Sequence, residues 1–170
     1  DNLGLRPATH TQLKAYIRTI RELLTTGTSV YNGDRCGLNW FRGEIPIYIA
    51  ASGPKTLQLA GEIADGVVIN TGLTPEIIRD SIEQVRIGCA RAGRDPGAVD
   101  MWWLPLTNVR DDREVAIDEI AMTLASAGSH LSRFTPAGKH IPAHLTEAIV
   151  QLGRRYHSDQ HDKPDSANRE

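Results

Sequence analysis

The chain has 170 residues, a formal net charge of -2, 24% charged residues and 40% hydrophobic residues. This length is enough for one domain with a sizeable core, and the small net charge gives no electrostatic reason to expect a nucleic acid or an anionic membrane as partner. No apolar run approaches the roughly 20 residues that cross a bilayer, and no secretory signal pattern is present. The two cysteines, Cys36 and Cys89, lack a metal-type spacing, which predicts free thiols in a reducing compartment, the cytoplasm.

The first part of the chain is predicted to form a helix, a hairpin and a strand. An apolar stripe with helical spacing predicts an amphipathic helix from Thr9 to Leu24, and Gly27 is placed to end it. The pair Asn32-Gly33 readily takes the positive φ angles of a tight hairpin. Ile45 to Ala51 is nearly continuously apolar, which predicts a strand buried on both faces, as parallel strands in α/β folds are.

Strands and helices then alternate along the chain. A short helix is predicted from Pro54 to Ala64, and a second buried strand from Val67 to Asn70. Thr74 and Pro75 are suited to the start of the next helix, which Gly93 ends. The remaining predicted elements are a strand region from Val99 to Val109, a helix from Asp112 to about Ala125, a loop-like stretch from Gly128 to Pro142 and a helix from Ala143 to Tyr156.

This alternation predicts an α/β fold with a parallel sheet and right-handed crossovers. Two architectures fit it: an open doubly wound sheet and part of a (βα)8 barrel. In both, ligands bind at the carboxyl ends of the strands. Two turns of small residues, Ser52-Gly53 and Thr71-Gly72, fall at those ends.

The turn Ser52-Gly53-Pro54-Lys55 is a candidate phosphate site. With Gly53 as the N-cap and Pro54 as the first helical residue, free N–H groups of the first helical turn face outward toward an anion. Lys55 opposes the helix macrodipole by roughly a few tenths of a kcal/mol, and a bound anion reverses that sign. The alternative is that Ser52 only caps the helix and Lys55 points into water. The stretch is neither a P-loop nor a GxGxxG motif.

The stretch IPIYIAASGPKTLQLAGEIADGVVIN, Ile45 to Asn70, closely resembles a segment of the luciferase-like monooxygenase family. The subgroup it resembles most is that of coenzyme F420-dependent reductases similar to methylenetetrahydromethanopterin reductase. The similarity runs roughly from Leu3 to His161 and includes LKAYIRTIRELLTTGTSVYNG upstream and GCARAGRDP downstream. It implies a TIM-type barrel larger than this chain. We therefore expect a partial (βα)8 barrel over residues 1–156, with about three parallel strands alternating with helices, and a polar tail or truncated linker over residues 157–170.

The resemblance also implies a function. Family members are flavin- or deazaflavin-dependent oxidoreductases in which reduced FMN or coenzyme F420 transfers hydride to a small-molecule substrate or activates oxygen, and many are homodimers. The family's small-residue turn contacts the cofactor phosphate. This implies a phosphate contact for Ser52, Gly53, Pro54 and Lys55, with Thr71 and Gly72 nearby. The catalytic residues stay unassigned, because the early barrel strands, which carry much of the ring and substrate site, are expected to be missing.

Two alternatives to this function remain open at the level of sequence. One is a barrel enzyme that acts on a phosphorylated small metabolite through the same kind of turn. The other is a truncated, non-catalytic chain, since both ends of the sequence read as cuts within a longer protein and the segment alone is expected to be inactive.

Two histidine pairs have the four-residue spacing of metal ligands on a helix: His140 with His144, and His157 with His161. Pro142 interrupts the first pair and the second lies in a polar tail, so we predict solvated histidines and no metal site.

Three further residues are predicted to be structural and not part of a binding site. Trp102 and Trp103 lie on one strand and must face opposite sides of the sheet, where packing is favoured over stacking on a ligand. Asp65 lies in a helix-ending turn, away from the ligand face.

Overall fold

The computed structural model describes residues 6–41, 43–132, 141, 143–160, 163, 166 and 168. The chain divides into two compact units. The first comprises Asp1–Ile69 and Ser81–Trp102, and the second comprises Asn70–Asp80 and Trp103–Glu170. The predicted change to a polar tail at residue 157 stays a prediction.

The first unit begins with helix α1, His10–Thr26, close to its predicted bounds. Thr9 caps it: its Oγ1 accepts from the backbone N–H of Gln12, and the Gln12 side chain accepts from the N–H of Thr9 at 2.8 Å. Gly27 ends the helix in the left-handed region with φ 81°.

The predicted hairpin is confirmed. Strands β1, Thr28–Tyr31, and β2, Asp34–Gly37, pair antiparallel. The two residues between them, Asn32 and Gly33, have φ 53° and 92°. These are the positive angles that a two-residue hairpin turn requires.

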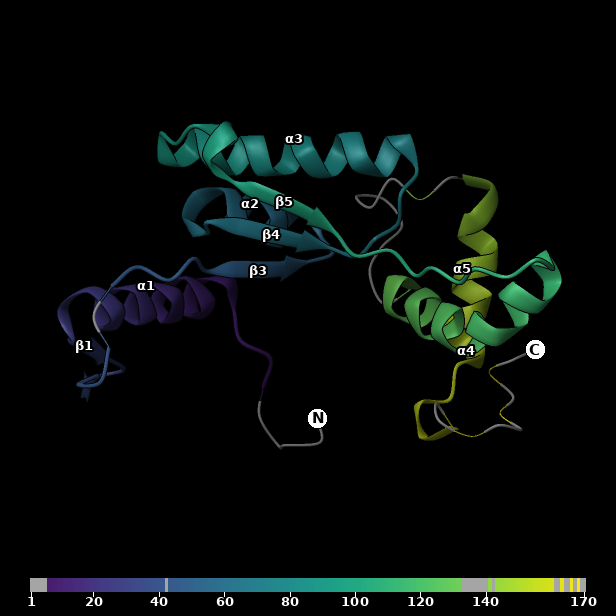
Figure 1. The fold of residues 1–170 in the computed structure, drawn as a ribbon, viewed down its shortest axis with the longest axis horizontal. Helices are drawn as coiled ribbons and strands as arrows, with labels where there is room; N and C mark the ends of the chain where they lie inside the picture. The colour runs from purple at the N-terminus through teal and green to yellow at the C-terminus, as the bar shows by residue number, and fades with distance from the viewer. Residues whose placement is uncertain are drawn as a thin grey trace. The chain divides into compact units, whose positions relative to one another are not determined.

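A three-stranded sheet forms the centre of the first unit. Its strands are β3, Tyr48–Ala51, β4, Gly66–Ile69, and β5, Asp100–Trp103, in the order β3-β4-β5. β3 and β4 pair in parallel, and the three arrows point the same way in Figure 1. The predicted parallel sheet is therefore present, although β3 starts at Tyr48 rather than at Ile45.

The helices that follow the strands cover one face of this sheet. Helix α2, Pro54–Ile63, follows β3, and helix α3, Pro75–Ala92, follows β4. Their apolar side chains form a core with the side chains on one face of β3 and β4. The fully or nearly fully buried members of this core are Ile49, Ala51, Leu57, Ala60, Val67, Ile69, Val85 and Cys89.

The prediction that the first strand is buried on both faces is wrong for β3. Ile49 and Ala51 are buried, but Tyr48 and Ala50 on the alternate face are exposed. β4, the central strand, is buried at three of its four positions. The difference arises because β3 is an edge strand. Helices cover the face that carries Ile49 and Ala51, and no other described helix or strand of this unit covers the face that carries Tyr48 and Ala50.

The second unit contains helices α4, Arg113–Ser132, and α5, Ala143–Arg155. Asp112 caps α4 as predicted, with its Oδ1 2.8 Å from the N–H of Glu114. The helix was predicted to give way to a loop by Gly128, and this is wrong for residues 128–132. A Cβ at Gly128 would collide with the side chain of Leu152 on α5, so this glycine serves close helix packing rather than helix termination.

The predictions for the loop before α5 and for the third strand are tested only in part or are wrong. Residues 133–140 and 142 of the predicted loop lie outside the described residues. β5 ends at Trp103, so the predicted strand region to Val109 is too long. Short 3-10 turns occur at Pro96–Ala98 and Ser158–Gln160. Within the described part of the chain, no helix has the length and apolar character needed to cross a bilayer.

Candidate functional site

The turn between β3 and α2 holds the four residues predicted to meet a phosphate: Ser52, Gly53, Pro54 and Lys55. Gly53 is the N-cap of α2 and has an extended backbone, with φ -129° and ψ 157°. The N-cap residue, Gly53, gives the helix no side-chain hydrogen bond, and the alternative in which Ser52 caps the helix stays a prediction. The Gly53 carbonyl accepts from the N–H groups of Thr56 and Leu57 at 3.1 and 3.0 Å. A Cβ built at Gly53 would meet no atom within 4 Å, so a ligand has room to approach the turn.

The electrostatics of this turn favour an anion. The first turn of α2 carries no acidic residue. Lys55 is exposed and takes part in no ion pair with the residues that the structure describes. The positive end of the helix dipole and the charge of Lys55 therefore both favour an anion, and no acidic residue of the first turn offsets them.

His10 lies beside this turn, and sequence reasoning missed it. It is the first residue of α1, and its Nε2 lies 3.1 Å from Oγ1 of Thr56 in the first turn of α2. The amino-terminal ends of two helices therefore lie side by side. A usable signal existed, because helices in repeated βα units begin at the carboxyl ends of the strands, where ligands bind.

The second predicted turn, Thr71-Gly72, belongs to the second unit. Thr71 is buried, and Gly72 has φ 109°, a backbone angle that favours glycine. Thr74 then accepts from the N–H of Ile77 at 3.4 Å and starts α3. The two turns thus lie in different units, and their shared role stays a prediction.

A polar cluster lies on the open face of the sheet in the first unit. One carboxylate oxygen of Asp100 accepts from the hydroxyl of Tyr48 and from Nε1 of Trp102, both at 2.6 Å. The hydrogen bond to Asp100 is the main reason that the pKa of Tyr48 is raised above its usual value. The same bonds lower the pKa of Asp100, with that from Tyr48 first. Trp102 is 60% exposed, so its indole is oriented by Asp100 and not by a packed core.

Asp65 has structural partners, as predicted. Its carboxylate accepts from Arg21 at 3.0 and 3.2 Å and from the backbone N–H of Ile47 at 2.8 Å. Burial acts to raise the pKa of Asp65, but the Ile47 hydrogen bond and the Arg21 guanidinium outweigh it, and the pKa is lowered. Asp65 therefore joins α1 to the segment that enters β3.

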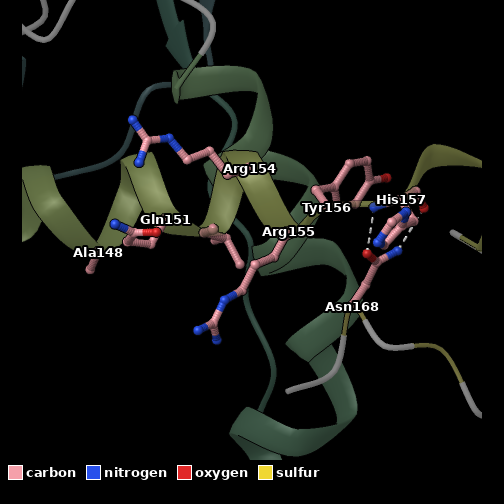
Figure 2. Close-up of a pocket in the computed structure, with 8 residues that line it drawn as sticks. Ala148, Gln151, Arg154, Arg155, Tyr156, His157 and Asn168 are labelled. Carbon is pink, nitrogen blue, oxygen red and sulfur yellow. Dashed lines mark hydrogen bonds between the residues drawn. The ribbon is translucent and has the colours of Figure 1, made fainter.

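Three cavities formed by described residues have none of the predicted cofactor residues in their walls. A cavity of about 480 Å³ lies beside Arg21 and Asp65, and one of about 320 Å³ has Asn70, the neighbour of Thr71, in its wall. The third, about 730 Å³, lies on α5 in the second unit (Figure 2).

Metal-binding side chains do not gather in the part of the chain that the structure describes. No three His, Cys, Asp or Glu side chains there lie close enough together to hold an ion. His140 and His161, one member of each predicted pair, lie outside the described residues. Cys36 and Cys89 are both free thiols.

Known proteins similar to this chain include a reductase and a dehydrogenase. A 5,10-methylenetetrahydromethanopterin reductase of Methanolobus tindarius is 38% identical over 109 residues, which is 59% of this chain and 32% of the relative. An F420-dependent glucose-6-phosphate dehydrogenase of Nakamurella multipartita is 30% identical over 128 residues, or 68% of this chain and 36% of the relative. The chain thus spans about a third of the length of these relatives.

A solved structure of an F420-dependent secondary alcohol dehydrogenase in complex with an F420-acetone adduct is similar in fold. It matches with a TM-score of 0.64 and 18% identity over 93% of this chain and 49% of that chain. This likeness shows the fold, and the described strands and helices are part of a (βα)8 barrel, as predicted.

The sequence also matches a family model, described as luciferase-like monooxygenase, over residues 6–169. That match covers nearly the whole chain. The chain therefore belongs to the luciferase-like monooxygenase family.

Proposed function

We propose that this chain contributes the phosphate-binding part of a coenzyme F420-dependent oxidoreductase. The proposal rests on the first turn of α2, at the end of β3. A Cβ at Gly53 would meet no atom within 4 Å there, and no acidic residue of the turn offsets the charge of Lys55. Relatives named as F420-dependent glucose-6-phosphate dehydrogenases favour F420 over FMN as the cofactor. The same names favour a small-molecule substrate.

The residues of the turn are chemically suited to a phosphate group. Gly53 has no side chain to block the approach. Pro54 suits the first helical position, because an N–H there would have no partner within the helix. Lys55 supplies a positive charge, and we predict a hydrogen bond from the hydroxyl of Ser52. A phosphate contact by Thr71 and Gly72, which belong to the second unit, stays a separate prediction. When bound, the cofactor supplies the hydride chemistry, and this turn anchors and orients it.

The proposal also covers the cellular compartment and the oligomeric state of the protein. Free thiols at Cys36 and Cys89 support the cytoplasm, a reducing compartment, as the place where it works. A homodimer remains a prediction taken from the family resemblance.

Negative charge placed at the turn tests the proposal. Gly53→Asp and Lys55→Glu each put a carboxylate against the phosphate. Two unit charges about 4 Å apart interact by roughly 1 kcal/mol in water and about 4 kcal/mol near a protein surface. We therefore expect each change to weaken F420 binding at least about tenfold in isothermal titration of the purified protein.

Arg18→Glu is the matched control, because Arg18 is an exposed cation on α1 and the charge change is the same as for Lys55→Glu. It should leave the F420 affinity within about twofold. The same affinity in both turn variants as in the unchanged protein would remove the phosphate assignment. Tighter binding of FMN than of F420 would redirect the proposal to a flavin enzyme.

A further inference from the structure

The cavity on α5 has the size and the walls of a small-molecule site. Its volume is about 730 Å³, within the range of roughly 300 to 1,000 Å³ that is usual for ligand pockets. Its lining comes from the last turns of α5 and from the chain that follows: Ala148, Gln151, Leu152, Arg154, Arg155, Tyr156, His157 and Asn168. Figure 2 shows the side chains of Arg154 and Arg155 leaving the helix in different directions, with Gln151 between them.

One wall of the cavity is held by a buried amide. The side chain of Asn168 accepts from the backbone N–H of His157 at 2.7 Å and donates to its carbonyl at 2.8 Å, as the dashed lines in Figure 2 show. The N–H of Asn168 in turn donates to Oγ of Ser166 at 3.1 Å, and both residues are buried. A buried amide with its polar groups paired makes this a fixed wall.

The cavity is basic. None of its described lining residues is acidic, and neither Arg154 nor Arg155 forms an ion pair within the described ranges. Glu147 lies next to the cavity and accepts from Nε2 of Gln151 at 2.7 Å. Arginine is the cation best suited to carboxylate and phosphate, because its guanidinium donates two parallel hydrogen bonds.

The helix dipole opposes an anion at this end of α5, but it is the weaker effect. A helix carboxyl end carries about half a negative charge, whereas Arg154 and Arg155 together carry two positive charges. One of the last carbonyls of the helix, that of Leu152, is also already paired, since it accepts from the N–H of Tyr156 at 3.0 Å. The described residues that line the cavity therefore carry a net positive charge.

We propose that this cavity is a second binding site, for a small organic anion with a phosphate or carboxylate group. The guanidinium of Arg154 or of Arg155 binds the anionic group, and the amide of Gln151 adds a donor. Ala148, Leu152 and the ring of Tyr156 accept the apolar part of the ligand. The site lies in the second unit and involves none of the residues of the proposed cofactor turn, so it stands independently of that proposal.

Titration with simple aromatic anions tests the site. The probes are phenyl phosphate and benzoate, with inorganic phosphate as the probe that lacks an apolar part. We expect phenyl phosphate or benzoate to bind several-fold more tightly than inorganic phosphate, because only the aromatic probes use the apolar lining. The stronger of the two identifies the anionic group that the cavity prefers. In the double variant Arg154→Gln and Arg155→Gln the affinity should fall at least about tenfold.

Two controls separate this site from general attraction to arginine and from the cofactor turn. Arg113→Gln removes an exposed arginine from α4, and Lys55→Glu disrupts the cofactor turn; both should leave probe affinity within about twofold. Probe binding that survives loss of Arg154 and Arg155, or that falls equally with Arg113→Gln, would overturn the proposal. Equal binding of aromatic and inorganic probes would also overturn it, because the apolar lining would then have no role.

Discussion

Asp100 organises the open face of the sheet through a single carboxylate oxygen. Tyr48 on β3 must cross β4 to reach it, and Gly66 is the residue that lies beneath the tyrosine ring. A Cβ at Gly66 would collide with that ring. The glycine therefore serves a side-chain contact between strands that are not adjacent, a role that the sequence pattern of one strand does not reveal.

Removal of the carboxylate charge at Asp100 should lower the pKa of Tyr48. The hydrogen bond from the neutral hydroxyl to Asp100 favours the protonated phenol, and the charge of Asp100 adds to this effect. In Asp100→Asn both contributions weaken, so Tyr48 should ionise at lower pH. Ultraviolet titration of tyrosinate measures the change, with Tyr48→Phe to assign the signal.

Asp34→Asn is the control for this titration, because Asp34 lies in the hairpin and the change in charge is the same. It should leave the Tyr48 titration where it was. An unchanged titration in Asp100→Asn would mean that the Tyr48 hydroxyl does not depend on this carboxylate.

At the scale of helices and strands, the sequence predicts the features that depend on the backbone angles of a few neighbouring residues. Asn32-Gly33 specified the hairpin and Gly27 ended α1, because positive φ angles at these places decide the backbone path. The turn at Gly53 could likewise be assigned from an apolar strand followed by Gly-Pro. The proximity of His10 to Thr56 could not, since it depends on two helices packing side by side.

The errors have the same origin. Gly128 is intrinsically unfavourable in a helix by about 1 kcal/mol relative to alanine, which predicts a break. In the folded chain α4 continues past it because α5 packs so closely there that a larger residue would collide with Leu152. Burial of Tyr48 was wrongly predicted because apolar composition does not tell an edge strand from a central one.

Close packing of α2 and α3 yields a stability prediction. A Cβ at Gly88 on α3 would collide with the backbone carbonyl of Gln58 on α2. Gly88→Ala should therefore destabilise the protein, because a backbone contact cannot move aside as a side chain can. Overpacking of this kind costs about 1 to 3 kcal/mol, more than the roughly 1 kcal/mol that alanine gains in helix propensity.

Urea unfolding measures this change in the free energy of unfolding. Gly37→Ala is the matched control, because a Cβ at Gly37 meets no atom within 4 Å. It should change stability much less than Gly88→Ala. Equal effects of the two variants would show that α2 and α3 do not pack as closely as the structure has them.

At the scale of the whole molecule, Asp65 connects parts of the first unit that are distant in sequence. Its carboxylate binds Arg21 of α1 and the N–H of Ile47 before β3. Its backbone carbonyl accepts from the N–H of Asp100, the first residue of β5, at 3.0 Å. These contacts lie at the amino ends of the strands, the side of a (βα)8 barrel that serves stability, whereas the turn at Gly53 lies at the carboxyl ends, where ligands bind.

This connection should make stability depend on pH in a defined direction. Hydrogen bonds and the Arg21 guanidinium hold the pKa of Asp65 below its unfolded value of 3.8, against the effect of burial. Its contribution to the free energy of unfolding is thus complete above that value and is lost as pH falls through the lower, folded-state pKa. Asp65→Asn should reduce the urea midpoint clearly at pH 6 and much less at pH 3. Asp34→Asn, an exposed carboxylate of the same unit, should have a small effect at both, and an equal loss at both pH values in Asp65→Asn would show that its charge does not hold these elements together.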